Sequence, residues 1–186
     1  NFNSPYKAAN IRGFWSRWHM TLSRFFRNYL YLPLGGNRKG NVRQFINLVI
    51  TMLLGGLWHG ASRNFILWGA LHGFYLSANH LWQMVRQEFK LSSSKSSFLG
   101  RGVAQILTFT AVVVAWVPFR TETISGAMNL LSVMFGSSGI TLPEYIKPGR
   151  FIVAFLIVWL APNAQQIMIR YRPTIETHNE AIKGWG

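Results

Sequence analysis

The stretch Phe45–Ala61, which reads FINLVITMLLGGLWHGA, constrains this chain more than any other part of the sequence. Fourteen uncharged, mostly apolar residues, Phe45–Trp58, lead directly into His59. As a helix this run would be about 21 Å long, whereas about 20 apolar residues are needed to cross about 30 Å of hydrocarbon. If the run enters a bilayer where the basic residues end at Arg43, His59 lies inside the membrane, where an ionisable side chain points to function. The alternative is that His59 sits at a helix end and faces water.

The composition favours a membrane protein. Of the 186 residues, 49% are hydrophobic and 13% are charged, about half the charged share of an ordinary soluble domain. Nineteen Lys and Arg stand against five acidic residues, all Glu, for a formal net charge of +14. Residues 1–87 contain ten basic residues and no acid, which fits either a nucleic-acid-binding surface or the cytoplasmic face of a membrane protein. Long uncharged runs are not typical of nucleic-acid modules, so we expect a lipid bilayer and no nucleic acid as partner.

Apolar runs predict the helices of the fold. The longest has twenty-one residues without Lys, Arg or acid and would form a helix of about 31 Å. Short segments rich in Lys and Arg stay on the cytoplasmic side, which puts residues 1–43 and 86–101 inside and the turn after His59 toward the outer side. We therefore expect an all-α, polytopic transmembrane protein with interfacial amphipathic helices. The four runs are Phe45–Trp58, Phe65–Val85, Val103–Phe119 and Phe151–Ala161.

The segments around these runs complete the predicted organisation. The chain is expected to be the C-terminal part of one larger membrane domain, because it begins with Asn and no signal peptide precedes its first polar stretch. We divide it into a basic cytoplasmic or interfacial segment (1–43), membrane helices and loops (44–171) and a tail (172–186). Smaller predicted features are a loop over Asn1–Gly13, a turn over Pro33–Gly40, a serine-rich loop over Ser92–Ser97, a short surface helix within Thr121–Lys147, and an amphipathic segment from Pro162 through Tyr171.

The stretch Phe14–Leu32 alternates aromatic residues with arginines at helical spacing, which predicts one amphipathic helix. Arg17, Arg24 and Arg27 would form its other edge and meet anionic lipid at the cytoplasmic interface. The predicted apolar face consists of Trp15, His19, Leu22 and Phe26.

Two stretches, Gly56–Gly60 (GLWHG) and Gly69–Gly73 (GALHG), echo each other. Each has glycines four positions apart and a histidine beside the second, and such glycines let helices approach closely in lipid. His59 and His72 are therefore expected beside packing seams, either as functional groups or as residues that hydrogen-bond across them. Burial disfavours the charged imidazolium, so His59 inside a membrane would be neutral and able to accept a proton. Because the chain has no Asp, a Ser-His-Asp triad is excluded and a lone histidine base acting on a hydroxyl remains.

A resident metal is disfavoured. The chain has no Cys and no HExxH motif, and His72 and His80 are eight positions apart, so we expect no bound metal. A haem held by histidines on facing helices is left open by the sequence. The glycine-rich turn that contains Arg38 and Lys39 lacks a Walker motif, and we interpret these two residues as membrane anchors.

Four strings carry a family resemblance: FNSPYKAANIRGFWSRWHMTLSRFFRNYLYLPLGGNRKG, NLVITMLLGGLWHGAS, LWGALHGFYL and APNAQQIM. Together they resemble the membrane-bound O-acyltransferase family, in its bacterial branch with the alginate O-acetyltransferase membrane subunit. The resemblance implies that His59 is the active histidine and that His19, in the FWxRWHxxLS element, is a second catalytic-site residue. Trp58, His72 and Asn64 are assigned to the wall of a substrate tunnel.

The resemblance also implies an activity. A multi-pass enzyme of the bacterial cytoplasmic (inner) membrane would pass acetyl groups from acetyl-CoA or another acyl thioester toward a cell-envelope or exported polysaccharide of the alginate type. Periplasmic or extracellular acetyltransferase proteins are expected as partners, and no tightly bound cofactor is expected. The alternative is a non-catalytic transporter or export channel in which His59 relays protons.

Overall fold

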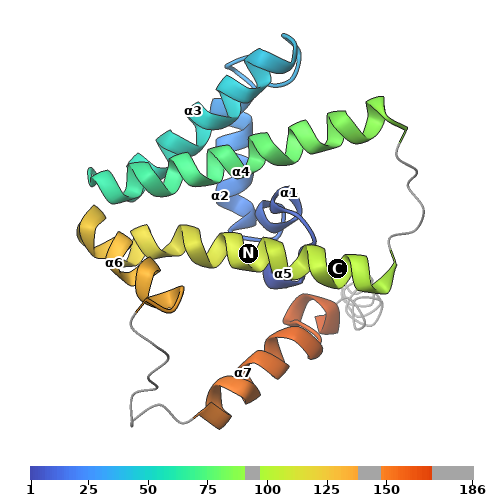
Figure 1. Cartoon of the computed structure of the whole chain (residues 1–186). Coiled ribbons are helices and arrows are strands. Elements are labelled where there is room, and N and C mark those ends of the chain that lie inside the picture. Colours follow the sequence, from blue (N-terminus) through green and yellow to red (C-terminus); the bar gives the residue numbers. More distant parts are fainter. Residues whose placement is uncertain (91–96, 138–147, 169–186) are drawn as a thin grey trace, which may run out of the picture. The chain divides into compact units, whose positions relative to one another are not determined.

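The computed structural model describes residues 1–90, 97–137 and 148–168, and in these ranges the chain is helical with no strand (Figure 1). The all-α prediction is confirmed for this part of the chain. Contacts divide the chain into two compact units, residues 1–146 and 147–186. The second unit contains α7 (Pro148–Leu160). The first contains η1 (Pro5–Lys7), α1 (Ile11–Trp15), α2 (Met20–Phe26), the π-helical η2 (Arg27–Tyr31), α3 (Asn41–His59), α4 (Arg63–Glu88), α5 (Phe98–Arg120) and α6 (Ile124–Met134).

The four apolar runs lie in helices, namely α3, α4, α5 and α7, except for Ala161, which follows the last residue of α7. The predicted surface helix is α6, where the Thr123 hydroxyl caps the N-terminus by accepting a hydrogen bond from the Gly126 N–H at 3.0 Å. The loop predicted over Asn1–Gly13 extends too far, because α1 begins at Ile11. The Asn10 side chain caps this helix by accepting a hydrogen bond from the Gly13 N–H. Residues 92–96 of the predicted serine-rich loop, residues 169–171 of the predicted amphipathic segment and the tail 172–186 lie outside the described residues. The boundaries 1–43, 44–171 and 172–186 stay a prediction.

The prediction of one continuous helix over Phe14–Leu32 is wrong. The chain leaves the helical path between α1 and α2, and His19 adopts a left-handed backbone conformation with φ of 42°. That conformation costs a non-glycine residue about 1–3 kcal/mol, so the surroundings must stabilise it. The stabilising contact is aromatic: Trp18 folds back and stacks on buried Phe14, with ring centroids 5.6 Å apart and planes at 16°. Tertiary burial of these rings therefore outweighs the helical periodicity.

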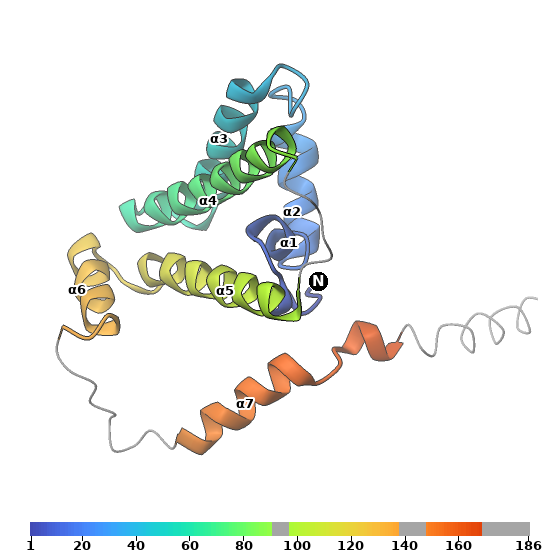
Figure 2. The same cartoon turned by 45° about the vertical axis from the view of Figure 1, so that its right-hand side comes forward.

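Helices α3 and α4 form an antiparallel hairpin, seen side by side in Figures 1 and 2. Glycines make the close approach possible. A Cβ on Gly69 would collide with the main-chain carbonyl oxygen of Met52, and a Cβ on Gly56 would collide with that of Phe65. Gly73 also lies in this seam, against Val49. The predicted role in helix packing is confirmed for Gly56, Gly69 and Gly73, whereas Gly60 follows the last residue of α3 and meets only the Phe65 ring.

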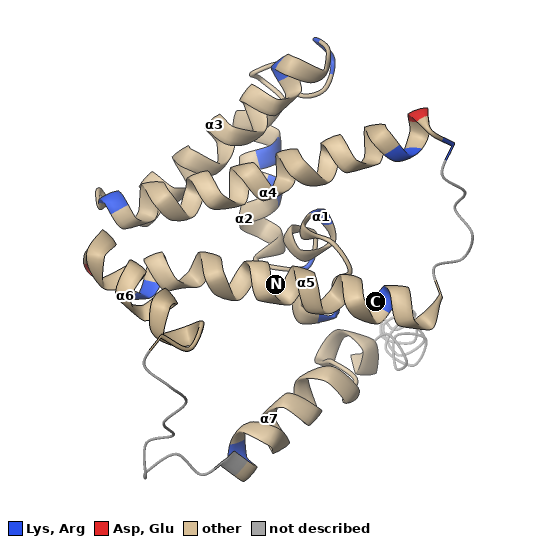
Figure 3. Cartoon of the chain, viewed as in Figure 1, with Lys and Arg blue, Asp and Glu red and all other residues tan. Residues whose placement is uncertain are grey.

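One helix among the described residues, α5, is long and apolar enough to cross a membrane by length and composition. Helices α3 and α4 are less hydropathic because they carry polar side chains that turn into the protein, among them Asn47, Asn64 and His72, each 0–2% exposed. Figure 3 shows Lys and Arg gathered at helix ends and along α2, and residues 64–85 of α4 carry no charge. The polytopic arrangement stays a prediction.

Candidate active site

An aromatic cavity of about 270 Å³ lies in the first unit, where α1, α2, α3, α4 and α5 converge. We call it the histidine cavity. His19 and His59, forty positions apart in the sequence and predicted from separate motifs, both line it. The four residues predicted to share the apolar face of Phe14–Leu32 also line it together, although the helix is broken. The full lining is Trp15, Trp18, His19, Leu22, Phe26, His59, Trp68, Trp116 and Phe119.

His59 is the last residue of α3, where Gly60 ends the helix in a backbone conformation (φ +149°) that favours glycine. Aromatic rings meet the imidazole nearly edge to face: Phe119 lies 4.9 Å away at 82°, and Trp68 lies 5.3 Å away at 84°. The side chain is partly exposed and makes no hydrogen bond to another described residue. Its nitrogens are thus available to a substrate, as a general base requires.

His19 is held by the first residues of the chain. The Asn1 side-chain amide donates a hydrogen bond to His19 Nδ1 at 3.3 Å, while Asn1 Oδ1 accepts from the main-chain N–H and hydroxyl of Thr21 at 2.8 and 3.0 Å. The ring of Phe2 covers the imidazole at 4.7 Å. Because Nδ1 accepts, the neutral ring carries its proton on Nε2, which can donate to a substrate. Nothing in the sequence indicated that Asn1 and Phe2 support this residue.

The three residues assigned to the tunnel wall are not part of the lining of the histidine cavity, and their assignment stays a prediction. His72 is 0% exposed and lies behind the wall, where its Nδ1 accepts a hydrogen bond from Trp15 Nε1 at 3.3 Å. Asn64 is buried and donates to the main-chain oxygen of Thr121 at 2.6 Å, which ties the start of α4 to the end of α5. Trp58 is 63% exposed, with its ring against Phe26 and His59. None of the three lines the histidine cavity.

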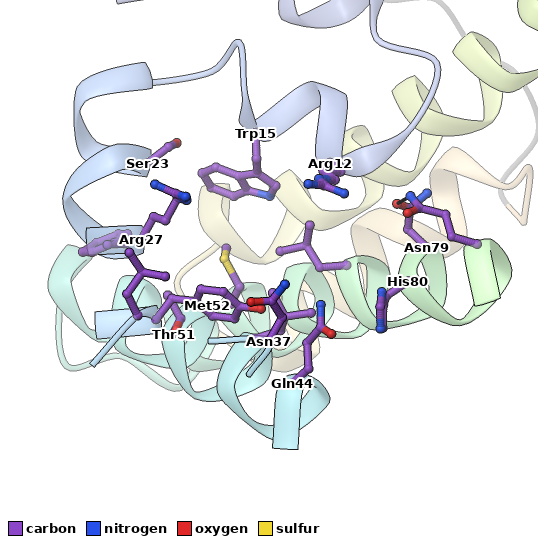
Figure 4. Close-up of a pocket in the computed structure, with 16 residues that line it drawn as sticks. Arg12, Trp15, Ser23, Arg27, Asn37, Gln44, Thr51, Met52, Asn79 and His80 are labelled. Carbon is purple, nitrogen blue, oxygen red and sulfur yellow. Dashed lines mark hydrogen bonds between the residues drawn. The ribbon is translucent and has the colours of Figure 1, made fainter. Parts of the chain in front are cut away.

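A second cavity of about 450 Å³, which we call the polar cavity, opens between α1, α2, η2, the first half of α3 and the second half of α4 (Figure 4). It shares two wall residues, Trp15 and Phe26, with the histidine cavity. The polar cavity was not predicted from the sequence. A usable signal was present, because Asn79 and Gln83 lie one helical turn apart inside the apolar run Phe65–Val85. Its remaining lining is Arg12, Ser23, Arg27, Tyr31, Leu32, Asn37, Gln44, Leu48, Thr51, Met52, Leu76, Asn79, His80 and Gln83.

Charge and hydrogen-bonding capacity distinguish this second cavity. Arg12 and Arg27 supply positive charge, and Gln83 Nε2 donates to Asn79 Oδ1 at 2.9 Å. Burial raises the pKa of the Tyr31 phenol above its ordinary value of 10.0, against the opposing effects of a hydrogen bond with the Gln44 side chain and of the two arginines. Tyr31 therefore stays a neutral hydrogen-bonding group at physiological pH. In the described ranges 1–90, 97–137 and 148–168, no three His, Cys, Asp or Glu side chains gather to hold a metal ion.

Comparison with known proteins identifies the family. Residues 1–119 match the model of the membrane-bound O-acyltransferase family. The chain belongs to this family. It is 44% identical over 147 residues to the peptidoglycan O-acetyltransferase of Helicobacter pylori, which covers 79% of this chain and 27% of that protein. It is 43% identical over 144 residues to the probable alginate O-acetylase AlgI of Pseudomonas fluorescens, covering 77% of this chain and 27% of that protein. The chain thus spans about a quarter of the length of these relatives.

A more distant relative is the teichoic acid D-alanyltransferase of Bacillus subtilis, 29% identical over 97 residues, or 48% of this chain and 25% of that protein. The relatives thus share acyl transfer in their names but differ in the acyl group and in the acceptor.

Proposed function

We propose that the full-length protein is an O-acyltransferase that crosses the bacterial cytoplasmic membrane several times and passes acetyl groups from an acyl thioester toward hydroxyl groups of a cell-envelope or exported polysaccharide. The observation that carries this proposal is that His19 and His59 line one aromatic cavity in a chain that belongs to an acyltransferase family. A proton-relay channel would not require a cavity shared by these two motif histidines.

In the proposed reaction, His59 accepts the proton of an acceptor hydroxyl, either on the polymer or on a carrier that takes the acyl group onward. The hydroxyl oxygen attacks the thioester carbonyl carbon, a C–O bond forms, the C–S bond breaks, and the leaving thiolate takes up the proton from the imidazolium. A positioned base of this kind contributes about 10²- to 10⁴-fold in rate. His19, with its proton on Nε2, orients the carbonyl oxygen by donating a hydrogen bond.

The polar cavity is the proposed approach for the donor, acetyl-CoA or another acyl thioester. The guanidinium groups of Arg12 and Arg27 suit phosphate groups, and the Asn79 and Gln83 amides suit the amide-containing arm that precedes the sulfur. The neighbouring segment 1–43 carries eight Lys and Arg and no acid, which favours a cytoplasmic location.

The proposed acceptor follows from the relatives. Two relatives above 40% identity are named for peptidoglycan and for alginate, so we propose a polysaccharide acceptor of this kind. Because such an acceptor lies outside the cytoplasm, transfer requires a route across the membrane, and we propose periplasmic or extracellular acetyltransferase proteins as partners that complete it.

The test uses the full-length protein in its own cells. We expect His59→Ala to abolish O-acetylation of envelope or exported polysaccharide while protein level and membrane insertion stay normal. Leu57→Ala, two positions earlier on an exposed part of α3, is the matched control and should keep acetylation. Unchanged acetyl content in His59→Ala would refute the assignment. Loss of polymer export with unchanged acetyl content per chain would instead support a channel.

A further inference from the structure

His72 and Trp15 form a buried pair beside the two cavities. Trp15 Nε1 donates to His72 Nδ1 at 3.3 Å, and the ring centroids lie 5.1 Å apart with planes at 79°. His72 is 0% exposed, enclosed by Phe14, Trp68 and Tyr75. A ring closed off in this way does not touch a substrate, so any effect it has on the reaction acts through its neighbours.

Trp15 is the neighbour that matters, because its indole belongs to the walls of both cavities. Figure 4 shows the indole reaching from α1 over the polar cavity, with Met52 of α3 on the facing side. Phe26 is the other residue common to the two walls. A direct route from the polar cavity to the histidine cavity would therefore pass the residues that the two walls share, Trp15 and Phe26.

The hydrogen bond identifies what the imidazole contributes. Because His72 Nδ1 accepts from Trp15, the ring is neutral with its proton on Nε2. Nε2 is buried and has no hydrogen-bond partner among the described residues, which is unfavourable. A leucine would fill a similar volume without that unpaired group. The specific contribution of His72 is thus an acceptor at its δ position for the Trp15 N–H.

We propose that His72 is a positioning residue whose hydrogen bond to Trp15 holds the indole as the partition between the polar cavity and the histidine cavity, and so controls how an acyl thioester reaches His59. The link to acyl transfer rests on the proposed function, whereas the partition rests on the geometry. Trp68 also links the two histidines, because its ring centroid lies 4.8 Å from that of His72 and 5.3 Å from that of His59.

The first measurement tests the link to acyl transfer. In membranes containing the full-length protein, kcat and KM are determined with acetyl-CoA as the donor probe. We expect His72→Leu and Trp15→Phe each to lower kcat/KM about tenfold, the effect of one lost hydrogen bond, and the double variant to lose little more. His72→Asn presents an oxygen at the δ position and should stay within about twofold of the wild type, whereas His72→Gln, whose acceptor lies one bond further out, should not.

This order separates positioning from packing. If His72 only filled space, His72→Leu would be the mildest change because its volume is close to that of histidine, and the smaller His72→Asn would be the most damaging. That reversed order would overturn the proposal. If His72→Leu fails to accumulate, the comparison of His72→Asn with His72→Gln decides the question, because packing favours the larger glutamine and positioning favours asparagine.

The second measurement tests the partition without relying on activity. Leu22→Cys places a thiol in the histidine cavity of a full-length protein from which any other cysteines have been removed. A membrane-impermeant methanethiosulfonate is added to the cytoplasmic face of oriented vesicles. We expect His72→Leu to speed labelling of Cys at position 22 about tenfold and His72→Asn to restore slow labelling.

Each of the two measurements can contradict a different part of the proposal. Equal labelling rates with and without His72→Leu would overturn the partition. Faster labelling with unchanged kcat/KM would overturn its role in donor passage. A wild-type protein that transfers no acetyl group would count against the proposed function, and the labelling rates would still decide the partition.

Discussion

The segments Gly56–Gly60 and Gly69–Gly73 have almost the same local sequence, GLWHG and GALHG, but the structure uses their histidines differently. His59 lines a cavity and is partly exposed, whereas His72 is fully buried and accepts a hydrogen bond from Trp15. The difference comes from position within the hairpin. His59 ends α3, where the chain turns away, while His72 lies in the middle of α4 with α1 packed over it. A shared motif therefore predicts shared helix packing but not a shared chemical role.

The strongest test of this comparison makes the same substitution at both histidines. His59→Asn should lower the rate of acetyl transfer about 10²- to 10⁴-fold, because an amide cannot act as a base. His72→Asn should stay within about twofold of the wild type, because the δ acceptor for Trp15 remains. Initial rates are measured in membranes with matched amounts of full-length protein. Equal losses at the two positions would remove the distinction between them.

Alanine substitutions at glycines of the two segments should also differ in how much they destabilise the protein. Gly69→Ala would place a Cβ against the Met52 carbonyl oxygen and should destabilise the protein by about 3 kcal/mol, since the main chain of α3 must move. Gly60→Ala meets only the edge of the Phe65 ring, which can shift, so its cost of about 1–3 kcal/mol comes from a positive-φ backbone conformation that is open almost only to glycine. Thermal unfolding of the full-length protein in detergent measures both. A larger loss of stability for Gly60→Ala than for Gly69→Ala would contradict the close packing of α3 against α4 at Gly69.

Asn64 offers a test of the region between the two histidines. Asn64→Ala removes the donor to the main-chain oxygen of Thr121 and should cost about 1–3 kcal/mol. Thr121→Val keeps the bond to the main-chain oxygen and removes the hydroxyl contact to Asn64 at 3.2 Å together with the hydroxyl's hydrogen bond to the Val117 oxygen at 3.1 Å, and it should cost less. The same unfolding measurement applies to both variants. If the two were equally harmless, Asn64 would not be the tie between α4 and α5.

The smallest effect concerns a glycine outside the seam. Gly102 lies in α5 with nothing within 4 Å of the position a Cβ would take. Gly102→Ala should therefore stabilise the protein by about 0.5–1 kcal/mol through helix propensity alone. A drop in the unfolding midpoint would reveal a close neighbour at this position in the full-length protein.

The helices, and the two histidines that line one cavity, could be named from the sequence because their signals are local. Uncharged runs bounded by Gly, Pro and basic residues define α3, α4 and α5, and the family motifs point to His19 and His59. The residues that contact these two histidines gave no such local signal in the sequence. Asn1 and Phe2 hold His19, and Phe119 packs on His59 from α5, sixty positions further along the chain. These partners depend on long-range packing, which has no periodicity to detect.

By itself, the sequence determined that this chain is helical, strongly basic, built around apolar runs with glycine seams, and equipped with two motif histidines, because composition and spacing act over a few helical turns. The tertiary structure decided that the stretch Phe14–Leu32 breaks at His19, that the break turns this histidine toward His59, and that His72 is withdrawn behind Trp15. The physical reason is the burial of aromatic rings such as Phe14 and Trp18, which stabilises a strained backbone that local helix propensity disfavours.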